Sequence, residues 1–160
     1  MTDFGRLLRV LVEGQVDFIV IGGVAAAVHG SARNTQDLDV VYSRQLENLK
    51  RLVAALKPLS PYLRGAPPGL PFAWAEETLR RGLNFTLTTS LGAFDILGEA
   101  SGAGGYAELL PHVIRAKAFE LEFPCLGLDK LIEVKRAAGR PKDFEAIAEL
   151  EALREERDRT

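Results

Sequence analysis

The segment VDFIVIGGVAAAVHG, residues 16–30, constrains the fold more than any other part of the chain. A short β-branched run closed by two glycines is typical of a buried strand that enters a tight turn. The small residues that follow predict a helix able to lie close against a sheet, with Gly30 as its stop. DLDVVY, residues 37–42, predicts a second strand. A strand, a close-packed helix and another strand indicate an α/β fold.

The rest of the chain alternates in the same way. The periodicity of apolar residues predicts amphipathic helices and further strands. We expect helices over 3–14, 44–58, 72–82, 128–139 and 142–158, an antiparallel strand pair over 83–90 and 93–99, and a strand pair or bent edge strand over 116–127. The stretch 58–72 holds five of the eight prolines and predicts a surface loop. The last few charged residues are expected to form a solvated or frayed end.

Length and composition set the broad class of protein. A chain of 160 residues without an internal linker is expected to form a single domain over residues 1–160. One cysteine rules out an internal disulfide, and with only two histidines it disfavours a structural zinc site. A net charge of −2 gives no support to unspecific nucleic-acid coating. No apolar run is long enough to span a membrane, so we expect a cytoplasmic protein.

Two aspartates open the strand at 37–42. Side chains alternate along a strand, so Asp37 and Asp39 project from one face, with about 6.5–7 Å between their Cα atoms. Two carboxylates held this close repel each other and lose hydration unless a cation joins them. Mg²⁺ is bound by one or two carboxylates and completes its shell with water and substrate phosphates. Asp95 lies alone between apolar residues of a later strand, where it also needs a positive partner.

Taken singly, these features have simpler explanations. A pair of aspartates one residue apart is commonly a hydrated turn or a helix cap, and Asp95 alone fits the exposed face of an antiparallel strand. FIVIGG resembles the start of a dinucleotide-binding unit, but the G-x-G-x-x-G pattern is missing. In phosphatases with two such aspartates, the apolar run precedes the acids, whereas here it follows them.

The order of the parts resembles the nucleotidyltransferase superfamily that includes DNA polymerase β. That pattern is a glycine pair, a D-h-[DE] motif opening the next strand, and a third acid in a later strand. IGGVAAAVHG and RNTQDLDVV, together with KRAAGRPKDFEAIAELE, are similar to the bacterial abortive-infection (AbiEii-like) nucleotidyltransferases and their small stand-alone relatives. The resemblance runs from about residue 15 to about residue 152.

The resemblance implies a small mixed sheet with flanking helices and a C-terminal helix pair that closes one side of a cleft. It implies transfer of a nucleoside monophosphate from an NTP to an acceptor, which is RNA, protein or a small molecule. Asp37, Asp39 and Asp95 would hold Mg²⁺, with Mn²⁺ as an alternative, and would carry the catalysis. The residues implied in nucleotide binding are Gly22, Gly23, Arg33, Thr35, Lys135, Arg140 and Lys142. Asp143 would orient the arginine or cap the last helix.

Some of these residues also have structural explanations. Thr35 is equally suited to cap its loop. Cations near a helix C-terminus are favourable by about 0.3–1 kcal/mol each, which accounts for a lysine and an arginine there without a ligand.

Two functional classes follow from the sequence. The first is an active transferase. The second is a non-catalytic nucleotide- or partner-binding relative, one component of a toxin–antitoxin pair with an antitoxin or a small helical protein as partner. Retention of all three acids favours the enzyme, because a binding module has no evident need for Asp95. The Pro-rich stretch 58–71 is either a cover for the acceptor groove or a passive connection.

Overall fold

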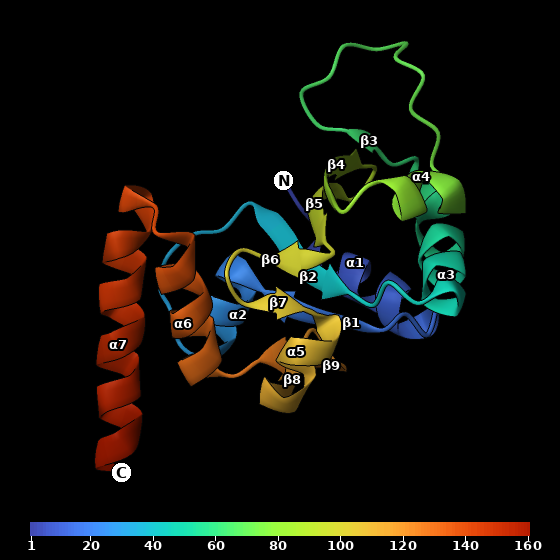
Figure 1. The fold of residues 1–160 in the computed structure, drawn as a ribbon. Coiled ribbons are helices and arrows are strands. Elements are labelled where there is room, and N and C mark those ends of the chain that lie inside the picture. The colour runs from blue at the N-terminus through green and yellow to red at the C-terminus, as the bar shows by residue number, and fades with distance from the viewer.

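A seven-stranded mixed sheet forms the centre of the computed structural model, which describes residues 1–160 (Figure 1). The strand order is β3-β4-β5-β2-β1-β9-β8. The strands of this sheet are β1 (Phe18–Ile21), β2 (Asp37–Tyr42), β3 (Tyr62–Leu63), β4 (Asn84–Thr89), β5 (Gly92–Leu97), β8 (Val113–Ala118) and β9 (Leu121–Leu126). A separate two-stranded ribbon joins β6 (Glu99–Ala100) to β7 (Gly104–Gly105).

Seven α-helices surround the sheet, which confirms the predicted α/β class. They are α1 (Phe4–Glu13), α2 (Gly22–Val28), α3 (Leu46–Leu56), α4 (Glu76–Arg81), α5 (Tyr106–Leu109), α6 (Leu128–Ala138) and α7 (Phe144–Arg159). Three short 3-10 turns cover Lys57–Leu59, Leu110–His112 and Pro141–Asp143. None of the helices is both long enough and apolar enough to cross a membrane.

The central strands mix both directions. β2 runs antiparallel to β1 and parallel to β5, and β9 runs parallel to β1. The predicted pair at 83–90 and 93–99 is the antiparallel pair β4–β5. The segment 116–127 lies in the hairpin β8–β9, so the predicted strand pair is confirmed.

One contiguous cluster of 34 buried apolar residues fills the interior. α1 contributes Leu7, Leu8 and Leu11 to it, at the helical spacing seen in the sequence. In β2, Leu38 and Val40 are fully buried, while the aspartates that alternate with them are only partly covered. The sheet therefore has an apolar face in the core and, at this end of β2, an open polar face.

Two sequence predictions need correction. α2 begins at Gly22, within the glycine pair, and not at Val24. The Pro-rich segment is not wholly loop, because Tyr62–Leu63 pairs with β4 as an edge strand. Of the two alternatives for 116–127, the strand pair is the one formed: β9 lies between β1 and β8 despite Pro124, and it pairs with β1 at Val20–Cys125. The last charged residues are exposed, as expected, and they continue α7 as far as Arg159.

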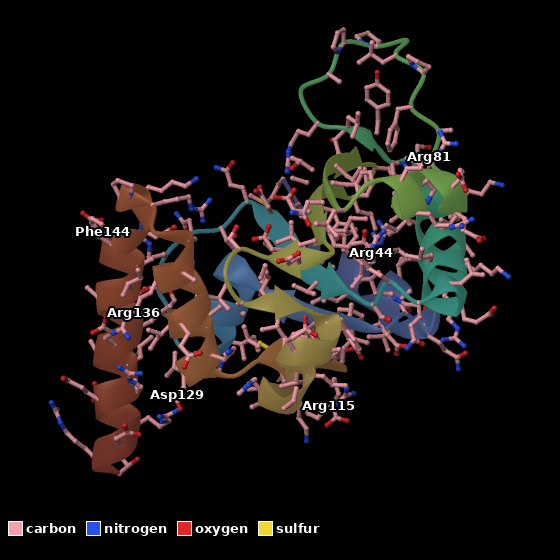
Figure 2. The ribbon with its side chains drawn as sticks, in the orientation of Figure 1. Arg44, Arg81, Arg115, Asp129, Arg136 and Phe144 are labelled. Atoms are coloured by element: carbon pink, nitrogen blue, oxygen red, sulfur yellow. The ribbon has the colours of Figure 1, made fainter.

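The C-terminal helices form the expected pair. α6 and α7 run side by side, with α7 as the outermost element of the molecule, and α6 also contacts α2 (Figure 1). Arg136 on α6 forms an ion pair with Glu151 on α7 at 2.8 Å, and its label in Figure 2 lies at α7. The connection from β3 to α4 projects from the opposite side of the molecule (Figure 1).

Candidate active site

The three aspartates predicted from the sequence converge on one face of the sheet. β2 and β5 are neighbouring parallel strands, and their register places Asp39 directly opposite Asp95. Asp37 lies two residues before Asp39 and projects from the same face. One carboxylate oxygen from each of the three residues lies within 4.8 Å of the others. Two parallel strands thus bring together acids that are far apart in the sequence.

The glycine pair makes room for this cluster. A Cβ atom at Gly22 would lie 2.2 Å from Oδ2 of Asp39, and the φ of Gly22 is +69°, a conformation that favours glycine. A Cβ atom at Gly23 would lie 2.4 Å from Oγ1 of Thr35. Both contacts are shorter than any ordinary van der Waals distance, so only glycine lets the start of α2 lie against the acids.

Burial and mutual repulsion alter the acidity of the cluster. Burial raises the pKa of Asp39, and the nearby carboxylates of Asp95 and Asp37 act in the same direction. The Lys135 ammonium opposes them, and the resulting pKa is about 7. Burial also raises the pKa of Asp95, an effect that the Arg64 guanidinium opposes. Without an added cation, the cluster therefore tends to retain a proton near neutral pH.

Arg64 is a member of the site that the sequence analysis missed. Its Nη2 donates to Oδ1 of Asp95, and its Nη1 lies 3.7 Å from Oδ1 of Asp37. The residue comes directly after β3, in the Pro-rich segment for which we predicted a loop. A lone arginine between prolines carries no signal of its own, because only the pairing of β3 with β4 brings it to the acids.

A cavity of about 740 Å³ opens over the aspartates. It is bounded by the start of β2 on one side and by α6 with the turn after it on the other. Of the residues predicted for metal or nucleotide binding, the cavity is lined by Asp37, Asp39, Asp95, Gly22, Thr35, Lys135, Arg140 and Lys142. Glu99 and Ser101, near the β6–β7 ribbon, also line it and had no signal in the sequence.

The cavity is lined by the three C-terminal cations that the resemblance implied in nucleotide binding, Lys135, Arg140 and Lys142. Arg140 donates from Nε to Oδ2 of Asp143 at 2.7 Å, and its Nη2 lies 3.4 Å from Oδ1 of the same carboxylate. Asp143 is buried, whereas Arg140 is half-exposed. The buried carboxylate thus fixes the guanidinium while leaving one side of it open to a ligand.

Two predicted residues lie to the side of the main cavity. Gly23 and Arg33 line a smaller adjoining cavity of about 170 Å³, which Thr35, Lys135 and Lys142 also border. The Arg33 guanidinium is 3.5 Å from the Glu145 carboxylate on α7, so it does not face the aspartates. Thr35 donates to the carbonyl oxygen of Asp37 at 3.3 Å, which is the loop-capping role considered for it.

The donor set suits a hard divalent cation. Carboxylate oxygens are the ligands that Mg²⁺ and Mn²⁺ prefer, and three of them converge here from two adjacent strands. The cluster carries three formal negative charges, with Arg64 and Lys135 as the nearby cations that act on its members. The residues therefore fit a bound divalent cation.

The mixed sheet with its flanking helices is a fold that a solved structure shares. The crystal structure of a putative nucleotidyltransferase from Thermotoga maritima matches the chain with a TM-score of 0.56, covering 93% of this chain and 94% of that chain at 16% sequence identity. A likeness at this identity shows a shared fold. No family model and no curated protein matches the sequence.

Proposed function

We propose that the protein is a metal-dependent nucleotidyltransferase, which moves a nucleoside monophosphate from an NTP to an acceptor. The observation that carries the proposal is the convergence of Asp37, Asp39 and Asp95 within 4.8 Å beside a large polar cavity. The fold likeness and the resemblance to the AbiEii-like nucleotidyltransferases support it. The acceptor class remains RNA, protein or a small molecule.

The three acids would supply the metal site. Asp37 and Asp39 would hold Mg²⁺, or Mn²⁺ in its place, and Asp95 would complete the site on the side of the acceptor. A bound divalent cation would neutralise charge on the triphosphate and favour the ionised form of the attacking oxygen. In the reaction, the acceptor oxygen forms a bond to the α-phosphorus and loses its proton, and pyrophosphate leaves.

The opposite wall of the cavity would bind the triphosphate. Lys135 and Lys142 offer ammonium groups, and Arg140 offers a planar fork that matches a phosphate. The buried Asp143 holds that fork in place, so less side-chain entropy is lost when a phosphate binds. Positioning and charge neutralisation account for most of the catalysis of such transfers.

The decisive experiment uses NTPs labelled in either the α- or the γ-phosphate, together with Mg²⁺ and cell RNA or cell extract. Label from the α-phosphate should appear on the acceptor, whereas label from the γ-phosphate should be released as pyrophosphate. Asp39→Asn should reduce the transfer by about a thousandfold or more, because a metal ligand is lost.

Asp129→Asn is the matched control. Asp129 lies in the first turn of α6, where its carboxylate pairs with Arg154 and Arg157 on α7, and it does not line the cavity. This variant should transfer label at the wild-type rate. Tight nucleotide binding without any transfer would instead indicate the non-catalytic module, and transfer of the γ-label would indicate a kinase.

A further inference from the structure

Arg64 extends the row of residues that crosses the active face of the sheet. Its backbone N–H donates to the carbonyl oxygen of Thr86 at 2.9 Å, which continues the β3–β4 pairing by one residue. Thr86 lies opposite Asp95, and Asp95 lies opposite Asp39. Thr86, Asp95 and Asp39 therefore lie on three neighbouring strands at one level of the sheet. Arg64 lies beside Thr86 at the same level, directly after β3. The arginine is fixed at the end of this row by the backbone.

The guanidinium of Arg64 is incompletely satisfied. Nη2 contacts Asp95, but Nη1 is buried and has no hydrogen-bond partner, because Oδ1 of Asp37 lies 3.7 Å away. A buried donor without a partner is unfavourable, because it has lost its hydration and gained no hydrogen bond in exchange. Only 28% of the Arg64 side chain is exposed, so water does little to compensate for the missing partner. The Arg64 guanidinium therefore lies between two carboxylates because of its charge. It makes a hydrogen bond to Asp95 but is too far from Asp37 to make a second one.

A divalent cation would bind the same carboxylates that Arg64 contacts. Oδ1 of Asp95 accepts from Arg64, and Oδ1 of Asp37 is the nearest acceptor to the second nitrogen of the guanidinium. Two positive groups cannot share these oxygens at contact distance without strong repulsion.

We propose that the Arg64 guanidinium neutralises the acidic cluster when no metal is bound, and that divalent cations compete with it for Asp95 and Asp37. This inference rests on the proposed metal site. Ion binding then requires the guanidinium to leave both carboxylates. Without metal, the positive charge of Arg64 stabilises the folded arrangement of the three carboxylates. It also lowers the affinity of the site for divalent cations, because an ion must first displace it.

Titration with Mn²⁺, followed by the paramagnetic resonance signal of the free ion, tests this competition. The measurement is made at about pH 8, above the folded-state pKa of Asp39. Arg64→Met removes the charge but keeps an apolar stem, and it should bind Mn²⁺ about tenfold or more tightly than wild type, because no positive side chain then competes with the ion for Asp95 and Asp37. Arg64→Gln repeats the test if the methionine variant does not fold.

Two controls separate charge from shape. Arg64→Lys keeps a positive charge and should stay within about threefold of wild type. Arg81→Met changes an exposed arginine on α4 that pairs only with Glu77, and its Mn²⁺ affinity should be unchanged (Figure 2). In a metal chelator, Arg64→Met should also unfold at a lower temperature than Arg81→Met, because the acids have lost their counter-charge.

Equal or weaker Mn²⁺ binding by Arg64→Met and Arg64→Gln would overturn the proposed competition while leaving the metal site intact. A gain in Arg64→Lys as large as that in Arg64→Met would also overturn it, since charge would then not be the cause. Absence of Mn²⁺ binding in all variants, wild type included, would overturn the metal site of the proposed function and the competition with it.

Discussion

Asp39 lies at the centre of the acidic cluster, with Asp95 opposite it on β5 and Gly22 against its carboxylate. Leu38 and Val40 anchor its strand in the core, so the side chain cannot turn away from its neighbours. Burial and the two adjacent carboxylates both raise the pKa of Asp39. Ionisation of the Asp39 carboxyl group is therefore unfavourable in the absence of a cation.

This cost predicts how the stability of the metal-free protein depends on pH. The ordinary pKa of the Asp39 carboxyl is 3.8, and the folded-state pKa is about 7. Between these values the folded protein retains a proton that the unfolded chain has released, so the free energy of unfolding falls as pH rises and levels off above about pH 7. Asp39→Asn should flatten this fall. Above neutral pH it should be more stable than wild type by as much as about 4 kcal/mol, because a pKa difference of one corresponds to about 1.4 kcal/mol.

Urea denaturation in a metal chelator, repeated across this pH range, measures the effect. Asp129→Asn should keep the wild-type pH dependence, because it removes a carboxylate that lies outside the acidic cluster. An unchanged slope in Asp39→Asn would show that ionisation of this carboxyl does not oppose folding.

At the scale of elements, α7 holds the loop that leads into the acidic strand. Oε1 of Glu149 accepts from the Ser31 hydroxyl at 2.5 Å, and its Oε2 accepts from the backbone N–H of Ala32 at 3.1 Å. The hydrogen bond from Ser31 lowers the pKa of Glu149, with smaller help from Ala32 and Arg33. A helix at the end of the chain thus fixes the backbone just before Asp37.

Glu149→Ala should therefore loosen residues 31–36 while leaving the sheet intact. Two hydrogen bonds to a carboxylate are lost, so the free energy of unfolding should fall by about 1–2 kcal/mol. Amide hydrogen exchange should become faster in this loop, and nucleotide binding should weaken. Glu156→Ala, at an exposed position on the same helix, should change neither. Unchanged exchange in the loop of Glu149→Ala would contradict the proposed anchoring.

The elements that the sequence predicted well are those whose pattern is local. Residues 37–42 form the expected strand, and the 83–90 and 93–99 segments form the expected antiparallel pair. The convergence of the acids was also predictable, but only through the family resemblance, since no local pattern places Asp95 beside Asp39. Arg64 and Glu149 could not be found in this way, because their roles depend on an edge strand of two residues and on a helix packed from the end of the chain.

At the scale of the whole molecule, the site joins parts of the fold that meet only in the native state. The acids come from β2 and β5, Arg64 from the segment after β3, and the cations of the facing wall from α6 and the turn beyond it. The unfolded chain cannot reproduce this arrangement, so a cation that binds here binds the folded protein selectively. Such binding must stabilise the entire fold by mass action.

Mg²⁺ should consequently raise the midpoint temperature of unfolding of the wild-type protein. At a free concentration about one hundred times the dissociation constant, the gain is about 2.7 kcal/mol, and for a chain of this length that corresponds to a rise of roughly 5–10 °C. Differential scanning calorimetry with increasing Mg²⁺ measures it. Asp39→Asn should lose most of the rise, whereas Asp129→Asn should retain it, because only the first variant removes a carboxylate of the cluster. An equal rise in all three proteins would assign the stabilisation to unspecific ion binding, because it would then be independent of the oxygen atoms that β2 and β5 bring together.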